Sequence, residues 1–314
     1  MKFLVTGAAG FIGSALVHRL VSEGHQVRGI LHRTQPRIFH TNVEYVTGDI
    51  TNREFLTKVM NNIDVIFHCA AVVKDYGPKK EFYQINVQGT KNLVTACETH
   101  SVKRFIFLSH IRYESENWET EYRATKKLAE QYLIEKYKEE QFPVVIIRPG
   151  HVYGPGATTW VLRPLRAIEK NRIALIDRGN GIFLHTFIEN LVDALLAAVD
   201  EPRALGETID VTDGVNTTTW GAYLNALAKM LHKPPIHRNL SKRTALCISK
   251  LMMMRYKLLK IEPWVTPTAV EIFTNTHTVS IEKARTILGY NPKIDFREGL
   301  RRVEHWLKTE GYIP

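Results

Sequence analysis

The sequence has few cysteines, no long hydrophobic run and no cluster of metal ligands. Its three cysteines, Cys69, Cys97 and Cys247, are too few and too scattered for a disulfide framework or a zinc cage. No apolar run approaches the ~18 residues that cross a bilayer, and the first residues do not form a signal-peptide pattern. The histidines lack metal-ligand spacing. We therefore expect a cytoplasmic protein without a metal site.

Acidic residues are in the minority: 42 Lys and Arg stand against 32 Asp and Glu, a formal net charge of +10. Basic residues are concentrated between residues 237 and 260, where no acidic residue occurs. Such charge suits nucleic acids, anionic membranes or anionic small molecules. The basic segment lacks interleaved aromatic residues and any nucleic-acid motif, so we expect no nucleic-acid partner.

Short apolar runs alternate with amphipathic stretches over the first half of the chain. The expected strands are 3–5, 27–31, 43–46, 65–68, 105–108, 144–147 and 208–211, and the expected helices are 12–23, 52–61, 87–99, 122–140 and 189–199. This alternation predicts an α/β fold with a Rossmann-type, doubly wound parallel sheet. It breaks after Gly156. We expect a dinucleotide-binding domain from 1–157 plus 183–213, and a smaller, mostly helical substrate domain from 158–182 plus 214–314.

A glycine-rich turn, Thr6-Gly-Ala-Ala-Gly-Phe-Ile-Gly13, follows the first expected strand and leads into a helical stretch. Gly7 permits a tight bend, Gly10 lets the backbone approach a pyrophosphate, and Gly13 allows close packing of helix on strand. The amino end of the helix then offers N–H donors to the phosphates. This strand–turn–helix context predicts a dinucleotide site.

The glycine spacing resembles that of the extended short-chain dehydrogenase/reductase family, the NAD-dependent epimerase/dehydratase superfamily. The resemblance extends along nearly the whole chain through Gly48-Asp49-Ile50, His68-Cys-Ala-Ala71, Asn86-Val-Gln-Gly-Thr90, Arg148–Gly156 and Leu288–Pro292. It implies dinucleotide contacts from Gly7, Gly10, Phe11, Ile12, Gly13, Asp49, Ile50, Ala70, Ala71, Lys126 and Pro149. It also implies a homodimer formed through the helices at 87–99 and 122–140.

Tyr122 and Lys126 form a Tyr-x-x-x-Lys pair at the start of an expected helix. A spacing of four places both side chains on one helix face. An ammonium beside a phenol favours the phenolate, which would lower the pKa of Tyr122 and let it exchange a proton with a substrate hydroxyl or carbonyl. The resemblance implies that Lys126 also binds the nicotinamide ribose.

The third catalytic group is expected just past the fifth strand, where the family has a Ser or Thr. Here the strand ends in Leu108-Ser109-His110. If the first Ser of a two-Ser run aligns with Ser109, the hydroxyl that polarises the substrate is replaced by His110. Either Ser109 takes the role by a shift of one residue, or the imidazole donates the hydrogen bond. We favour Ser109 narrowly.

The cofactor preference is expected to depend on the end of the second strand. NAD-preferring members of the family resemble one another in an acidic residue there, which binds the adenosine ribose. This chain has Ile30-Leu-His32-Arg33 instead, with Arg37 following. Because guanidinium groups suit a 2′-phosphate, we expect NADP(H), with NAD as the alternative.

The sequence constrains the identity of the substrate less than that of the cofactor. Pro263–Thr268, Ser280-x-x-Lys-Ala284 and Leu288–Pro292 resemble the 3β-hydroxysteroid dehydrogenase and dihydroflavonol reductase branch. The leading interpretation is therefore an NAD(P)-dependent oxidoreductase that acts on a secondary alcohol or ketone of a hydrophobic ring or sugar-like molecule. The alternatives are a nucleotide-sugar epimerase or dehydratase with tightly bound NAD, and a non-catalytic dinucleotide-binding regulatory module.

Residues 245–261 combine Leu, Ile and Met with Lys250, Arg255 and Lys257. We expect an ordinary helix that packs on the substrate domain. A flexible apolar lid, or a helix resting on an anionic membrane surface, is the alternative.

Overall fold

The computed structural model describes residues 1–112 and 120–314. Within these residues, strands form a seven-stranded sheet in the order β10-β6-β5-β4-β1-β2-β3, with every pair parallel. The strands are β1 (Lys2–Thr6), β2 (Gln26–Leu31), β3 (Val43–Thr47), β4 (Val65–His68), β5 (Arg104–Leu108), β6 (Val144–Pro149) and β10 (Thr208–Val211). All seven expected strands and the Rossmann-type α/β class are confirmed.

The strand order reverses between β1 and β4, which are neighbours in the sheet. Chain order proceeds outward from this point in both directions. Crevices at the carboxyl ends of strands beside such a reversal are where open α/β sheets bind ligands. The glycine turn after β1 and the Cys69–Ala71 segment after β4 therefore meet at the expected edge.

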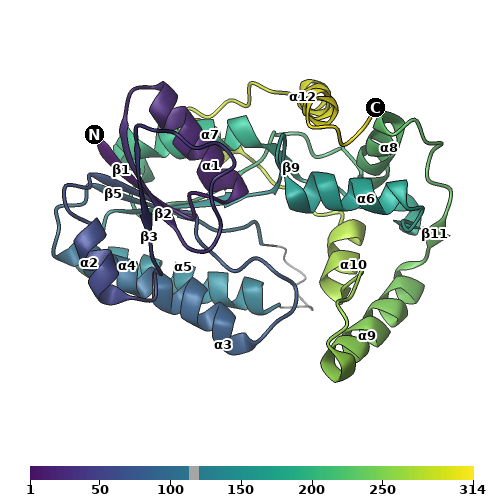
Figure 1. Cartoon of the computed structure of the whole chain (residues 1–314), viewed down its shortest axis with the longest axis horizontal. Helices are drawn as coiled ribbons and strands as arrows, with labels where there is room; N and C mark the ends of the chain where they lie inside the picture. The colour runs from purple at the N-terminus through teal and green to yellow at the C-terminus, as the bar shows by residue number, and fades with distance from the viewer. Residues whose placement is uncertain (113–119) are drawn as a thin grey trace.

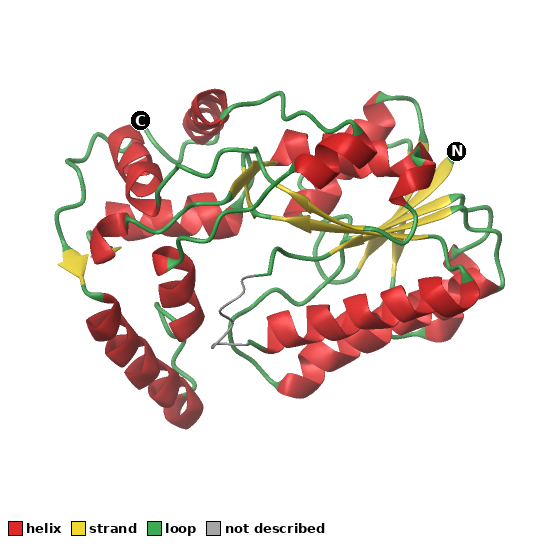
Figure 2. Cartoon of the chain, turned by 180° about the vertical axis from the view of Figure 1, so that it is seen from behind, coloured by secondary structure: helices red, strands yellow, loops and turns green. Residues whose placement is uncertain are grey.

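Helices cover both faces of the sheet (Figures 1 and 2). On one face, α1 (Phe11–Ser22) and α7 (Ile188–Asp200) pack into one hydrophobic core. On the other face, α2 (Arg53–Val59), α4 (Gly89–Glu98) and α5 (Glu121–Glu140) share a second core with the sheet. Burial on both faces explains why the strands are continuous apolar runs rather than alternating ones.

The helix expected at 87–99 begins earlier and is irregular. It consists of α3 (Lys79–Phe82), a π-helical turn η1 (Tyr83–Gln88) and α4. Within η1, the Asn86 side chain turns inward and pairs with both backbone groups of Val72, at 2.8 and 3.2 Å. A polar side chain that bonds a neighbouring segment is a common reason for such a bulge.

The segments with no clear alternation in the sequence form short elements at one end of the molecule (Figure 1). They are η2 (Thr158–Leu162), α6 (Arg163–Glu169), β8 (Leu175–Ile176), η3 (Asp177–Gly179), α8 (Trp220–Met230), β11 (Asn239–Leu240), α9 (Lys242–Leu259) and α10 (Pro267–Thr274). Outside these segments, β7 (His151–Tyr153) pairs with β9 (His185–Phe187), and η4 (Pro202–Ala204) lies between α7 and β10. The last two helices, α11 (Glu282–Leu288) and α12 (Phe296–Thr309), return to the sheet, where Ala284, Val303 and Leu307 join the core of α1 and α7.

Helix α9 packs on the substrate domain, as expected, but only through a narrow face. Only Ala245 and Ser249 of its 18 residues are buried. Its inner face lies on α10, but Leu251, Met254, Leu258 and Leu259 are exposed. No helix in the described part of the chain is both long and apolar enough to cross a membrane.

Candidate active site

The glycine turn has a geometry that other residues would disrupt. Gly7 has φ +69°, and a Cβ there would lie 2.9 Å from the backbone nitrogen of Ala70. A Cβ at Gly13 would lie 2.2 Å from the Gly7 carbonyl oxygen, and the Gly10 N–H donates to that oxygen at 2.9 Å. No side chain caps the amino end of α1, all of which is described, so its first N–H groups face the turn. This cradle fits a dinucleotide pyrophosphate.

The remaining expected dinucleotide contacts lie at the carboxyl edge of the sheet. Phe11 and Ile12 form the first turn of α1, and Pro149 ends β6. Ile50 is buried beneath Gly89, where a Cβ would come within 2.6 Å of the Ile50 Cδ1. Ala70 and Ala71 follow β4 and are half-buried.

A chain of buried hydrogen bonds links this edge to α5. The Ala70 N–H donates to Thr6 Oγ1 at 3.1 Å, and Thr6 Oγ1 lies 2.8 Å from His68 Nδ1. His68 Nε2 lies 3.0 Å from Thr90 Oγ1, whose hydroxyl donates to the Asn86 carbonyl. Burial holds the pKa of His68 well below its usual range, so its ring is neutral.

Asn86 continues the chain to the catalytic helix. Its Nδ2 donates to Thr125 Oγ1 at 3.0 Å, and the Thr125 hydroxyl bonds the carbonyls of Glu121 and Tyr122 at 2.6 and 3.0 Å. Thr125 directly precedes Lys126. The chain therefore fixes the position of the Tyr122–Lys126 turn relative to the glycine turn.

Tyr122 and Lys126 lie together at the start of α5, as expected. Lys126 is 2% exposed, its Nζ lies 3.7 Å from the centroid of the Phe107 ring, and burial lowers its pKa to about 7. Burial also raises the pKa of Tyr122 to about 12. We expected Lys126 to lower the Tyr122 pKa, but burial of the phenol raises it, and the cation that opposes this rise is Arg123 rather than Lys126. Tyr122 is therefore a protonated phenol at neutral pH.

Ser109 and His110 follow β5, and the His110 ring borders Tyr122. The Ser109 N–H still bonds to Ile147 in the sheet, at 2.8 Å, and its hydroxyl is buried. The His110 and Tyr122 rings are 5.3 Å apart. Among the described residues, Ser109 Oγ and both His110 ring nitrogens have no hydrogen-bond partner. Burial, then the positive charges of Arg123 and Lys126, lowers the pKa of His110 to about 3, so its ring is neutral.

The sequence did not predict a buried carboxylate near Lys126. Glu130 is fully buried one turn beyond Lys126, and Arg148 donates to it from Nε at 3.0 Å and Nη2 at 2.5 Å. Arg112 bonds the same carboxylate. The spacing of four from Lys126 was the only signal, since it places Glu130 on the same helix face.

His32 and Arg33, expected at the adenosine ribose, lie just after β2. His32 Nε2 lies 3.5 Å from Asp49 Oδ2, and both side chains are exposed. Arg33 is exposed as well. Arg37 lies beside Gly156: its Nη1 is 3.2 Å from where a Gly156 Cβ would stand, and the Phe11 ring is 3.6 Å from the same point.

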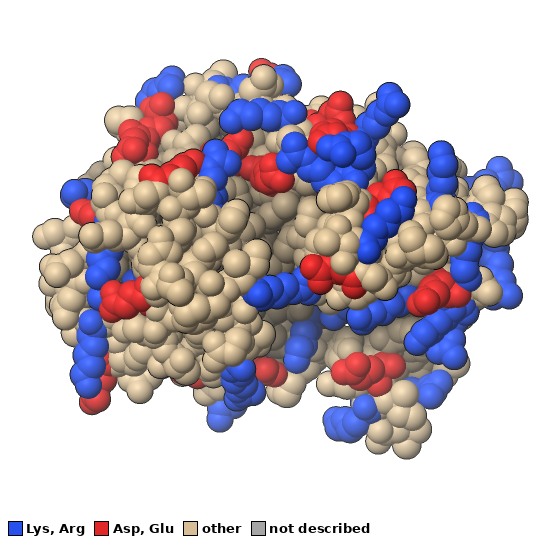
Figure 3. Space-filling model, turned by 45° about the horizontal axis from the view of Figure 1, so that its top comes forward, with Lys and Arg blue, Asp and Glu red and all other residues tan. Residues whose placement is uncertain are grey.

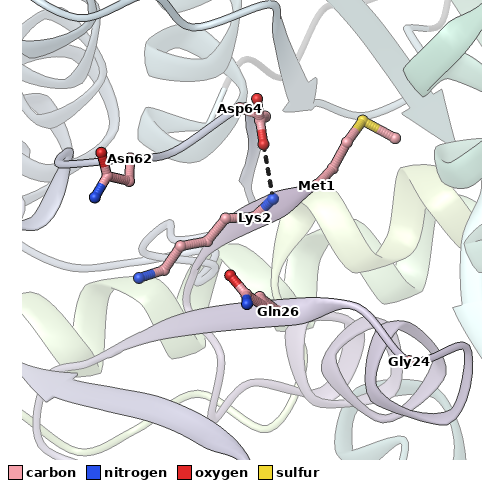
Figure 4. Close-up of a pocket in the computed structure, with 6 residues that line it drawn as sticks. All are labelled: Met1, Lys2, Gly24, Gln26, Asn62 and Asp64. Atoms are coloured by element: carbon pink, nitrogen blue, oxygen red, sulfur yellow. Dashed lines mark hydrogen bonds between the residues drawn. The ribbon is translucent and has the colours of Figure 1, made fainter.

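One pocket of the surface lies away from this site. A pocket lined by Met1, Lys2, Gly24, Gln26, Asn62 and Asp64 is at the amino ends of the strands, where the Lys2 N–H donates to Asp64 at 2.8 Å (Figure 4). That edge is opposite the one where such sheets bind ligands.

Lys and Arg are spread over the visible face among carboxylates (Figure 3). The described residues contain no cluster of three His, Cys, Asp or Glu that could hold a metal ion.

The sheet and its glycine cradle define a Rossmann-type NAD(P)-binding protein, and the Tyr122–Lys126 pair lies on a helix beside that sheet. The chain belongs to the NAD dependent epimerase/dehydratase family, whose model matches residues 3–212. It is an NAD(P)-dependent enzyme of the extended short-chain dehydrogenase/reductase type. The family resemblance described from the sequence motifs is confirmed.

Relatives cover nearly the whole chain. The chain is 28% identical to a 2-alkyl-3-oxoalkanoate reductase of Stenotrophomonas maltophilia (97% of this chain, 98% of that protein). It is 27% identical to a 3-beta-hydroxysteroid dehydrogenase of Mycolicibacterium neoaurum (93% and 87%) and to a UDP-glucose 4-epimerase of Vibrio cholerae (96% and 94%). An epimerase structure from Methanothermobacter thermautotrophicus has the same fold, with a TM-score of 0.81 at 23% identity over 99% of this chain and 93% of that one.

Proposed function

We propose that the protein is an NADP(H)-dependent oxidoreductase that interconverts a ketone and a secondary alcohol on a hydrophobic ring or sugar-like molecule. The observation that carries the proposal is the set of buried, unpartnered polar atoms on Ser109 and His110 beside Tyr122, within the described residues. Buried polar groups without partners are rare, and at a site they are typically completed by a ligand. A substrate oxygen supplies the missing acceptor.

The bound nicotinamide would supply or accept the hydride. Tyr122 holds the proton that goes to the substrate oxygen in reduction, since its raised pKa keeps the phenol protonated at neutral pH. His110, as a neutral imidazole with one N–H, donates a second hydrogen bond to that oxygen. We now favour His110 over Ser109 for this role, because its ring lies against the Tyr122 ring while Ser109 remains within the sheet ladder. Lys126 would bind the ribose and favours the anionic state of Tyr122 after proton transfer.

The Tyr122→Phe variant tests the mechanism. Removing the phenol hydroxyl should lower turnover of a carbonyl substrate by about 10²–10⁴-fold, because general acid catalysis contributes on that order. NADPH affinity, followed by fluorescence titration, should stay near the wild-type value. Turnover that survives the substitution contradicts the mechanism.

A pair of variants distinguishes the two candidate donors. We expect His110→Ala to lower kcat by about 10²–10³-fold, the loss typical of one oxyanion donor, with NADPH affinity unchanged. Ser109→Ala should have a much smaller effect on kcat. The reverse ranking would return the role to Ser109.

The preference for NADP(H) is supported by the basic residues past β2. The first acidic residue after Leu31 is Glu44, whereas His32, Arg33 and Arg37 follow Leu31 closely, and Arg37 lies beside Gly156. The Arg33→Ala variant should bind NADPH more weakly and leave NADH binding nearly unchanged, because only NADPH carries the 2′-phosphate. Equal losses for the two cofactors would contradict this assignment.

The alternative is a nucleotide-sugar epimerase or dehydratase, which the similarity to the Vibrio cholerae enzyme favours. Such chemistry returns the hydride to the same molecule and so retains its cofactor. One experiment distinguishes the reductase from the epimerase or dehydratase. The protein is purified gently and denatured, and any dinucleotide that it releases is identified by chromatography. Tightly bound NAD supports the epimerase or dehydratase, whereas an empty site that prefers exchangeable NADPH supports the reductase. A cytoplasmic location also remains our proposal, resting on the sparse cysteines.

A further inference from the structure

Helix α9 carries a narrow apolar stripe on its outer face. Cys247, Leu251, Met254 and Leu258 are all exposed, with Leu251 at 55% and Leu258 at 74%. Their spacing of four, three and four residues places them within about 60° of one another around the helix axis. Nothing in the described part of the chain covers this stripe. Leu259, Ile261 and Trp264 extend the exposed apolar surface past the end of the helix.

Cations border the stripe on both sides. At 100° per residue, Arg243, Lys250 and Lys257 lie along one flank and Arg255 lies along the other. Lys260 follows the last helical residue. The chain has no acidic residue between His237 and Ile261. An apolar stripe flanked by long basic side chains is typical of a helix that lies in a membrane interface, where those side chains extend to the lipid phosphates.

The inner face of α9 is fixed to the rest of the protein. Ala245 is buried among residues of α10, and Lys242 pairs with Glu271 at 2.8 Å. The Tyr256 ring contacts the Tyr76 ring, with centroids 4.8 Å apart, in the segment that follows β4. The helix is therefore held with its stripe outward, at an outer edge of the molecule away from the sheet (Figures 1 and 2).

We propose that α9 and residues 259–264 dock on an anionic lipid bilayer. The stripe would enter the boundary between headgroups and acyl chains, and the flanking cations would meet the lipid phosphates. A second copy of this chain fits less well. Two stripes packed together would bring Arg243, Arg255 and Lys257 against the same cations of the other copy, and like charges beside an apolar seam destabilise pairing.

Vesicle flotation tests the proposal. We expect the protein to bind vesicles of phosphatidylcholine mixed with phosphatidylglycerol, to bind phosphatidylcholine alone weakly, and to dissociate as salt rises. The Arg255→Gln/Lys257→Gln variant should bind the anionic vesicles about 25-fold more weakly, at about fivefold for each cation. The matched control Lys58→Gln/Lys229→Gln removes the same charge from exposed positions elsewhere and should bind like the wild type.

The apolar stripe is tested separately. The Leu251→Ser/Leu258→Ser variant alters exposed side chains and should keep its thermal unfolding midpoint while losing most vesicle binding. Trp264, 66% exposed, should shift its fluorescence to the blue on vesicle binding, a shift absent from Trp264→Phe. Unchanged binding by the serine variant, or none by the wild type, would overturn the proposal. So would a dimer in solution that this variant dissociates, since the stripe would then be an interface between copies.

Discussion

At the scale of single residues, Lys126 combines function with an energetic cost. An ammonium that is 2% exposed beside the Phe107 ring has lost most of its hydration, and its pKa falls from 10.5 to about 7. Desolvating the Lys126 ammonium costs free energy, and this cost lowers the free energy of unfolding of the protein. Active sites commonly contain such locally unfavourable groups, and the surrounding core compensates for them.

The Lys126→Met variant should therefore be more stable than the wild type but inactive. Between pH 7 and 10.5 the unfolded chain binds more protons at Lys126 than the folded one, so wild-type stability rises with pH across that window. Lys126→Met lacks this dependence. Urea unfolding should show the variant more stable by on the order of 2 kcal/mol at pH 6, with a smaller difference at pH 9. A difference that does not change with pH would contradict the assigned pKa.

At the scale of secondary-structure elements, Glu130 joins α5 to β6. Its fully buried carboxylate accepts from Arg148 on β6 and from Arg112, which follows the Ser109–His110 segment. Asn86 provides a second link, from η1 to Thr125 of α5. The first turns of α5 are thus held from two sides, which sets where Tyr122 and Lys126 lie.

We expect Glu130→Gln to destabilise the protein by roughly 3 kcal/mol, because it leaves two largely buried guanidinium groups without a counter-charge. The matched control is Glu135→Gln, an exposed position on the same helix, which should change stability by less than about 0.5 kcal/mol. Chemical denaturation of both variants measures the difference. Equal midpoints would show that the buried carboxylate contributes nothing to the attachment of α5.

At the scale of the whole molecule, α4, α5 and η1 form an outer face that we propose to be a dimer interface. Leu128 on α5 and Tyr83 on η1 are each 46% exposed, and the two elements are in contact. Large apolar side chains close together on one face are a common feature of subunit interfaces. Antiparallel pairing of these helices with those of a second copy would bury both residues.

The Leu128→Arg variant should halve the mass measured by light scattering coupled to size exclusion, because it places a charge in the buried centre of that interface. Leu251→Arg, an equivalent change on α9, serves as the control and should leave the dimer intact. A dimer that persists in Leu128→Arg would exclude this face, and a wild-type monomer would exclude the dimer itself.

Several features of the site could be predicted from the sequence because they depend on local patterns. The glycine turn needs only neighbours in the chain, and the Tyr122–Lys126 spacing follows from helix geometry. The Glu130 cluster could not be predicted, since its three members, Glu130, Arg112 and Arg148, come from separate parts of the chain. The direction of the Tyr122 pKa shift was wrong for a related reason: proximity of Lys126 is visible in the sequence, whereas burial is not.

The sequence by itself determined the parallel sheet, its seven strands to within two residues at each end, and the position of the dinucleotide turn. Strand runs, helix periodicity and glycine geometry are short-range properties, and each is encoded within about ten residues. Tertiary structure alone decided which polar atoms remain without partners, how far the pKa values of Lys126 and Tyr122 move, and which face of α9 points outward. These depend on desolvation and on contacts between distant segments, which only the folded chain brings together.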